Sequence, residues 1–147
     1  MEALCAVIAE LHRLYNIKKR MIGIRSGYIY INRLRIHALH GVLKQERTVG
    51  NDYELTLRAK YDISDACATD DINKALNYAA VCDEVRQVMT EPCALVERVA
   101  YKIGERIMKT FPQVEEIDLT LTKKNPPMGA DCDGAGVEIH LINNKTD

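Results

Sequence analysis

The chain contains 147 residues and carries a formal net charge of −1. This length favours a single domain that can bury a core of its own. The balanced charge does not favour nucleic-acid binding, because proteins that neutralise phosphates usually carry a basic surplus. The sequence has no apolar run long enough to span a membrane, so a membrane protein is not expected.

The cysteines indicate the cellular setting. The sequence has five of them, which are scattered and form no Cys-x-x-Cys pair. This pattern argues against both a disulfide framework and a zinc ribbon. No signal peptide is recognisable either. Together these features favour a reducing, cytoplasmic setting.

The N-terminal stretch, residues 1–20, has the character of an extension. Its apolar residues recur at helical spacing, which is typical of an amphipathic helix. Two interpretations stay open: a helix that docks on another surface, or residues upstream of a natural start at Met21. Glu2 and Glu10 argue against a targeting peptide. We therefore divide the chain into this extension and a domain over residues 21–147.

Two strands are predicted at the start of the domain. The first covers residues 27–39, and its apolar side chains change parity near Asn32 and Arg33, which predicts a bulge or bend. A polar loop that carries Glu46 follows. The second strand covers about residues 52–63 and alternates strictly between apolar and polar side chains. Such alternation favours an antiparallel sheet with one buried face.

Two helices are predicted next. The first covers about residues 78–90 and has a stripe of apolar side chains at helical spacing. The second opens near Pro92, because proline suits the first turn of a helix. It stops before Pro112.

The next predicted strand, residues 117–123, ends in two adjacent lysines and a proline pair, Pro126-Pro127. Its alternation places Lys123 on the apolar face and Lys124 on the polar face. A desolvated lysine can act as an acid or base near neutral pH. A lysine that only snorkels out at the strand edge is the commoner case. This segment alone leaves both interpretations open.

The element order predicts the fold class. It is strand, strand, helix, helix, strand, strand, with the last strand at about residues 135–142. This order favours an α+β fold with a four-stranded antiparallel sheet and two helices on one face. The two open edges of such a sheet invite pairing with other copies. We therefore expect a ring or barrel assembled from several chains.

Three further side chains could carry chemistry, and each also has an ordinary explanation. Glu46 lies in a polar loop, where most glutamates are simply solvated. Tyr78 opens the first helix, where a tyrosine usually packs against a neighbour. Glu97 lies in the first turns of the second helix, where the helix dipole favours a carboxylate. The free N–H groups at that helix end could also hold a ligand.

No metal or cofactor site is predicted. His37 and His40 fall on opposite faces of a strand, and no His/Cys cluster has catalytic-zinc spacing. The glycines around Ala135 lead into a strand rather than a helix, unlike a phosphate-binding loop. Any catalysis must therefore come from lysine, glutamate and tyrosine side chains.

A family resemblance joins these candidates. Four segments occur in the order and spacing seen in dihydroneopterin aldolase: His40-Gly41 through Glu46, Asn77-Tyr78-Ala79, Leu95-Val96-Glu97 and Leu121-Thr122-Lys123-Lys124-Asn125-Pro126-Pro127. The segment 133–139 also resembles the last strand of that family, and the likeness covers about residues 22–143. It implies a tunnelling fold, in which subunit sheets join into a barrel. Such barrels are commonly octamers of two tetrameric rings, with active sites between adjacent subunits.

The resemblance also implies a reaction. 7,8-Dihydroneopterin is cleaved by a retro-aldol step to 6-hydroxymethyl-7,8-dihydropterin and glycolaldehyde, in folate biosynthesis. The electrons of the broken C–C bond can enter the C=N bond of the pterin ring, giving an enamine. Neither a metal nor a Schiff-base lysine is then needed, and no cofactor is expected. The protein has to supply only proton transfer and positioning.

The resemblance assigns a role to each site residue. Lys123 matches the catalytic lysine, which acts as acid and base. Tyr78 matches the tyrosine that assists protonation of the enamine. Glu46 matches the glutamate that orients the substrate hydroxyls. Whether this glutamate comes from the same subunit as Lys123 or from its neighbour stays open. Glu97 matches the anchor of the aminopyrimidine edge, and the backbone of Val96 completes this grip.

The sequence departs from the family pattern in one loop, and two rival functions stay open. Residues 128–132 stand where relatives often carry Gly-His-Tyr. The nearest rival function is an epimerase acting on dihydroneopterin or its triphosphate, which would need extra basic residues. Lys124 and Arg98 are the nearest candidates for that role. A non-catalytic pterin-binding protein would keep Glu97 without needing Lys123 and Tyr78 together.

Overall fold

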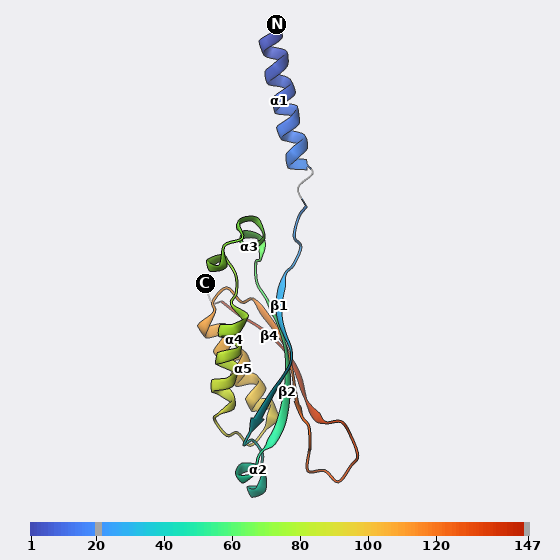
Figure 1. Ribbon diagram of the computed structural model, residues 1–147, viewed down its shortest axis with the longest axis vertical. Coiled ribbons are helices and arrows are strands. Elements are labelled where there is room, and N and C mark those ends of the chain that lie inside the picture. Colours follow the sequence, from blue (N-terminus) through green and yellow to red (C-terminus); the bar gives the residue numbers. More distant parts are fainter. Residues whose placement is uncertain (20–21, 146–147) are drawn as a thin grey trace.

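A four-stranded antiparallel sheet with two long helices on one face forms the body of the protein (Figure 1). The computed structural model describes residues 1–19 and 22–145. The strands follow one another across the sheet in sequence order: β1 (Tyr28–Ala38), β2 (Asn51–Lys60), β3 (Glu116–Lys123) and β4 (Ala135–Ile142). The predicted fold class is confirmed, and β1 and β4 are the edge strands.

Five α-helices and one short 3-10 helix are assigned within the described residues: α1 (Glu2–Lys19), α2 (Lys44–Thr48), α3 (Ser64–Thr69), η1 (Ile72–Lys74), α4 (Tyr78–Met89) and α5 (Val96–Thr110). The predicted helix at 78–90 is confirmed as α4, whose N-terminus is capped by the Asn77 side chain. The prediction that the second helix opens near Pro92 is wrong, because α5 begins at Val96. The backbone of Cys93 is bonded instead to the loop after β1.

The loop predicted to carry Glu46 contains a short helix, α2, which the sequence did not indicate. Glu46 lies in its first turn, and its side chain accepts hydrogen bonds from the backbone N–H groups of Val42 and Leu43. The N–H of Leu43, the N-cap residue, is one that a helix start would otherwise leave unpaired. The carboxylate of Glu46 therefore organises its own loop.

The predicted phase change in the first strand is confirmed as a bulge. The register between β1 and β2 shifts between Ile31 and Leu34, and Arg33 adopts a left-handed backbone with φ of 55°. The Arg33 N–H donates to Thr56 Oγ1, and its guanidinium forks onto the Glu54 carboxylate at 3.1 and 3.3 Å. These contacts hold a conformation that costs a residue with a Cβ about 1–2 kcal/mol.

The core lies between the helix pair and the inner face of the sheet. Alternate residues of β2 and β3 are buried there, against the apolar stripes of α4 and α5. Lys123 is the last residue on the buried face of β3 and is 9% exposed. The strand parity therefore predicted its side correctly.

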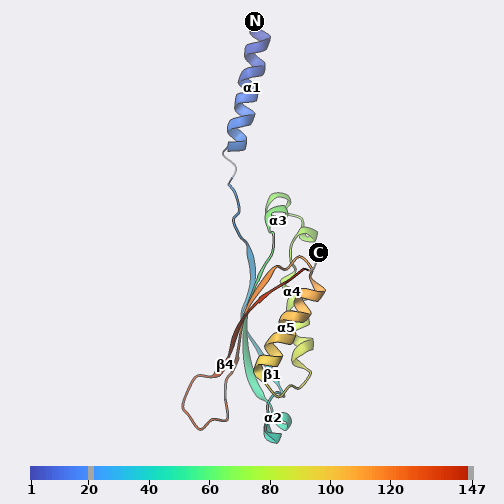
Figure 2. The same ribbon diagram turned by 180° about the vertical axis from the view of Figure 1, so that it is seen from behind.

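The chain direction decides what gathers at each end of the sheet. β3 ends, β2 begins and α5 begins at the end that carries α2, whereas α4 begins at the opposite end, near α3 (Figures 1 and 2). α4 has 12 residues, and a helix of that length is about 18 Å long. The start of α4 is therefore remote from the end of β3.

α1 lies apart from the sheet (Figure 1). Its large apolar side chains from Leu4 to Leu14 are each more than half exposed. The predicted domain boundary between residues 20 and 21 lies outside the described residues, and so does Met21, the proposed natural start. The last two residues of the chain are also outside them. No helix in the described part of the chain is long and apolar enough to cross a membrane.

The bulge provides a stability test. Arg33→Gly and Arg33→Ala both lose the ion pair to Glu54, but only glycine relieves the positive φ. We expect the glycine variant to be more stable than the alanine variant by about 1 kcal/mol in urea denaturation. Equal unfolding free energies would show that the φ of Arg33 carries no strain.

Candidate active site

A cleft of about 450 Å³ opens where β3 ends. Its walls come from the α2 loop, the start of α5, the end of β3 and the start of β4. Glu46, Val96, Glu97 and Lys123 all line it. Four of the five predicted site residues are therefore brought together by one chain, from segments far apart in the sequence.

The Glu46–Lys123 ion pair is the most buried polar contact of the cleft. Lys123 Nζ donates to Glu46 Oε1 at 2.6 Å, and each side chain is 11% exposed. Glu46 Oε2 accepts the backbone N–H groups of Val42 and Leu43 at 3.1 Å each. The donation from Lys123 is the main reason that the pKa of Glu46 lies below its ordinary value, with burial opposing it. The Glu46 carboxylate is therefore ionised at neutral pH.

The loop before α2 is shaped for this pair. Gly41 has a φ of 150°, and a Cβ there would lie 2.3 Å from the carboxylate carbon of Glu46. Only glycine leaves the space in which Glu46 turns back toward its own loop and toward Lys123. The Gly41 carbonyl accepts a hydrogen bond from Arg47 Nε at 2.7 Å, which closes the turn.

The end of β3 is fixed by a reciprocal asparagine contact. Asn51 Nδ2 donates to the Asn125 carbonyl at 2.6 Å, and the Asn125 N–H donates to Asn51 Oδ1 at 3.2 Å. The proline pair that follows cannot extend the ladder. Lys123 is thus held at the last paired position, directly opposite Tyr53 on β2.

Two buried side chains of this region were not predicted as site residues, His40 and Tyr53. Tyr53 Oη donates to the His40 carbonyl at 3.1 Å. Burial, with help from the charge of Glu46, raises the pKa of Tyr53 to about 12. Burial and the nearby Lys123 lower the pKa of His40 to about 4. Both are neutral at physiological pH. Parity marked Tyr53 as buried, but no sequence signal placed it opposite Lys123.

Glu97 and the start of α5 form the open rim of the cleft. Glu97 is exposed and lies in the first turn of the helix. The N-cap residue, Leu95, offers no side-chain cap, so N–H groups of the first turn stay available to a ligand. Glu97 makes no ion pair within the described residues. The carboxylate can therefore accept hydrogen bonds from an incoming molecule.

Tyr78 does not line this cleft. It is the first residue of α4, is 68% exposed, and lies at the far end of that helix from the α5 start. One chain therefore does not bring Tyr78 to Lys123.

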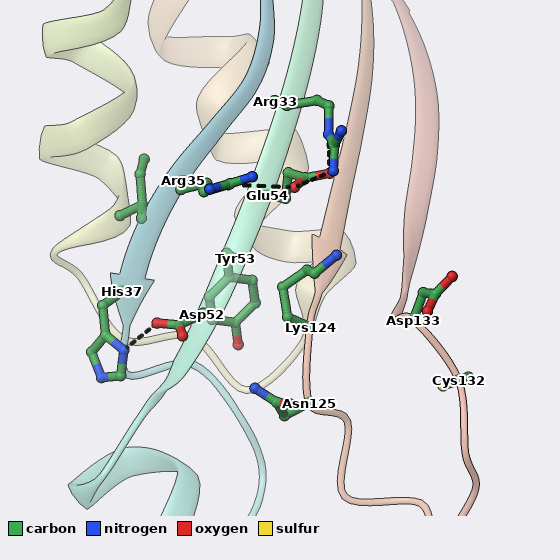
Figure 3. Close-up of a pocket in the computed structure, with 11 residues that line it drawn as sticks. Arg33, Arg35, His37, Asp52, Tyr53, Glu54, Lys124, Asn125, Cys132 and Asp133 are labelled. Atoms are coloured by element: carbon green, nitrogen blue, oxygen red, sulfur yellow. Dashed lines mark hydrogen bonds and ion pairs between the residues drawn. The ribbon is translucent and has the colours of Figure 1, made fainter.

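Lys124 lies on the opposite face of the sheet, as strand parity predicted. There it joins Arg33 and Arg35 in a hollow of about 750 Å³, with Glu54 between them (Figure 3). Three carboxylates, those of Asp52, Glu54 and Asp133, also line this hollow and balance its three lysine and arginine side chains. The hollow consequently has no large charge surplus for an anion.

The divergent loop, residues 128–132, does not line the cleft either. It is exposed throughout, and Cys132 lines the hollow on the other face. Within the described residues, no three histidine, cysteine or acidic side chains are grouped so that they could hold a metal ion.

The fold and the cleft define an α+β protein with a buried lysine–carboxylate pair at the end of its sheet. The sequence model of the family described as FolB, dihydroneopterin aldolase, matches residues 29–140. The chain belongs to the dihydroneopterin aldolase family.

Individual relatives agree with this assignment. Dihydroneopterin aldolase from Staphylococcus epidermidis is 33% identical over 115 residues, which cover 78% of this chain and 95% of the relative. The crystal structure of FolB from Vibrio cholerae has a TM-score of 0.75 at 30% identity, covering 82% of this chain and 100% of that chain. Escherichia coli dihydroneopterin aldolase, solved in complex with neopterin, has a TM-score of 0.72 at 26% identity, covering 78% and 98%.

The ion pair predicts a pH-dependent stability. The folded pKa of Glu46 lies below its ordinary value of 4.5. Its contribution is therefore present above that value and is lost as the pH falls through the lowered folded pKa. We expect Glu46→Gln to destabilise the protein by about 2 kcal/mol at about pH 7 and by much less at about pH 3.5.

Urea denaturation of wild type and variant at both pH values measures this difference. The exposed Glu138→Gln serves as the matched control and should change little at either pH. If Glu46→Gln lowered the unfolding free energy by the same amount at both pH values, the Glu46–Lys123 ion pair would not be the source of the stability.

Proposed function

We propose that the chain cleaves 7,8-dihydroneopterin by a retro-aldol reaction to 6-hydroxymethyl-7,8-dihydropterin and glycolaldehyde, in folate biosynthesis. The observation that carries the proposal is the buried Glu46–Lys123 pair in a cleft whose rim holds Glu97. Family membership and the neopterin complex of the E. coli relative support the choice of a pterin.

Lys123 supplies the acid–base chemistry in this proposal. A side-chain hydroxyl of the substrate that enters the cleft meets the ammonium and the carboxylate of the pair together. Glu46 orients the hydroxyl. The ammonium of Lys123 first gives a proton to water, and the neutral amine then takes the hydroxyl proton, directly or through a water. The electrons of the C–C bond pass into the pterin C=N bond, so the reaction requires neither a metal nor a Schiff base.

Glu97 anchors the pterin ring. Its carboxylate can accept two hydrogen bonds from the aminopyrimidine edge. The backbone of Val96 and the free N–H groups at the start of α5 complete the grip. The distance between this anchor and Lys123 decides which carbon of the side chain reaches the acid–base pair.

Tyr78 protonates the enamine from a neighbouring subunit. The start of α4 lies at the wrong end of its own chain to do so. β1 and β4 are the open edges through which copies can pair. We propose an octamer of two tetrameric rings, with active sites between adjacent subunits.

The cleft favours an uncharged substrate over a triphosphate. Lys123 is the one cation among the residues that line it, and Glu46 already neutralises that charge. Lys124 faces the other side of the sheet, where it lines the hollow of Figure 3. An inert pterin-binding protein would not require the buried pair at all, since two charges are costly to bury.

A cytoplasmic setting is part of the same proposal. All five cysteines are free thiols in the structure. Free thiols suit a reducing compartment.

The direct assay is incubation of the purified protein with 7,8-dihydroneopterin and a chelator, followed by separation of the products. Glycolaldehyde should form at an undiminished rate in the chelator, and borohydride should trap no adduct on the protein. Absence of glycolaldehyde would overturn the aldolase. A trapped adduct or chelator inhibition would overturn the metal-free, Schiff-base-free chemistry.

The two adjacent lysines provide a matched pair of variants. Lys123→Ala should lower kcat by at least about 100-fold, because it removes the acid–base group. Lys124→Ala should leave kcat within about two-fold, since surface substitutions away from a site usually have small effects. Wild-type turnover by Lys123→Ala would remove Lys123 from its assigned role.

The shared site can be tested by complementation. Lys123→Ala and Tyr78→Phe should each be slow alone. Co-assembled in equal amounts, they should regain about one quarter of the wild-type activity per site, because one site in four then receives both native residues. Activity that never exceeds that of the separate variants would argue that both residues serve the same subunit.

A further inference from the structure

His40 is fully buried beside the cleft and has no part in the proposed reaction. Its side chain is 0% exposed. Its Nδ1 accepts a hydrogen bond from the backbone N–H of Cys93 at 3.1 Å, and its Nε2 has no hydrogen-bond partner in the described part of the chain. Most buried polar atoms are hydrogen-bonded, so a buried histidine that bonds through only one of its two ring nitrogens needs an explanation.

The contact to Cys93 is one of a pair. The N–H of Gly41 donates to the Cys93 carbonyl at 2.9 Å, so both backbone groups of Cys93 are bonded to the His40–Gly41 segment. The two segments are 53 residues apart in sequence. Cys93 precedes Val96, the first residue of α5, by three positions.

His40 also contacts the residue opposite Lys123. Its carbonyl accepts the Tyr53 hydroxyl at 3.1 Å, and the two rings meet edge to face at a centroid distance of 5.3 Å. Lys123 Nζ lies 5.9 Å from the centroid of the same Tyr53 ring. His40 therefore contacts Tyr53, which pairs with Lys123 across the sheet. It also contacts Cys93, which lies four residues before Glu97 in the chain.

We infer that His40 is a positioning residue that holds the start of α5, with its pterin anchor, at a fixed distance from the Glu46–Lys123 pair. This inference rests on the proposed function for the identity of the ligand. The contacts of the His40–Gly41 segment with Cys93 and Tyr53, here called the clamp, lie within the chain and do not depend on the proposed function. Misplacement of a binding group by about 1 Å can cost a large factor in rate.

The clamp requires a neutral ring. Nδ1 accepts from Cys93, so the proton of the imidazole sits on Nε2. A second proton would set an N–H against the N–H of Cys93 and add a cation near Lys123, Arg47 and Lys102. Burial and these charges lower the pKa of His40 to about 4, so the clamp is intact at neutral pH.

Two substitutions of His40 distinguish the role of its Nδ1 acceptor from the role of its aromatic ring. His40→Phe keeps an aromatic ring against Tyr53 but leaves the Cys93 N–H buried without an acceptor. His40→Asn loses the ring but keeps an oxygen close to the position of Nδ1. His37→Phe, on the exposed face of β1, is the control. Each variant is studied below its own melting temperature.

Three readouts are compared: amide exchange of the 91–97 segment, calorimetric affinity for neopterin, and kcat and KM for 7,8-dihydroneopterin with their pH profiles. For His40→Phe we expect faster exchange and about ten-fold losses in affinity and in kcat/KM. The shape of the pH profile should stay that of the wild type. His40→Asn should recover part of each loss, and His37→Phe should match the wild type.

Two results would overturn the inference. A His40→Phe protein that melts earlier but binds neopterin with wild-type affinity would make His40 merely structural. A pH profile that loses a limb would make it a proton-transfer group instead. A wild type that binds neopterin without cleaving dihydroneopterin would remove the proposed reaction. The exchange and affinity comparisons would still decide the role of His40.

Discussion

The burial of two opposite charges at the end of β3 is the constraint on which the rest of the site depends. An ion taken out of water costs several kcal/mol, and the cost is offset only if each charge is paired and hydrogen-bonded. Glu46 meets this condition with one lysine and two backbone N–H groups. The geometry of Gly41 is a local consequence, because the carboxylate occupies the space of a side chain there.

One side of the cleft is fixed by hydrogen bonds, and the other side is open. Lys123 is held by the β2–β3 ladder and by the reciprocal contact of Asn51 and Asn125. The opposite rim, with Glu97, is exposed and unpaired within the described residues. A ligand can therefore enter at the rim and reach a charge pair whose position is already set. Such preorganisation is what proton transfer to a bound substrate requires.

Much of the fold followed from sequence patterns, because those patterns are local. Strand parity placed Lys123 and Lys124 on opposite faces, and the phase change near Arg33 predicted the bulge. The misses share another cause. α5 starts late because the backbone of Cys93 bonds to a segment 53 residues away, and α2 forms around a carboxylate whose partner is 77 residues away. The remoteness of Tyr78 likewise depends on the direction of a helix in space.

The proposed binding of a pterin between Glu97 and the Glu46–Lys123 pair is tested most directly by a crystal structure of the assembled protein with neopterin. We predict the aminopyrimidine edge on the Glu97 carboxylate, the side-chain hydroxyls within hydrogen-bond distance of Lys123, and Tyr78 of a neighbouring subunit beside the ligand. Neopterin bound instead in the hollow around Arg33 and Lys124, with the cleft empty, would contradict the account.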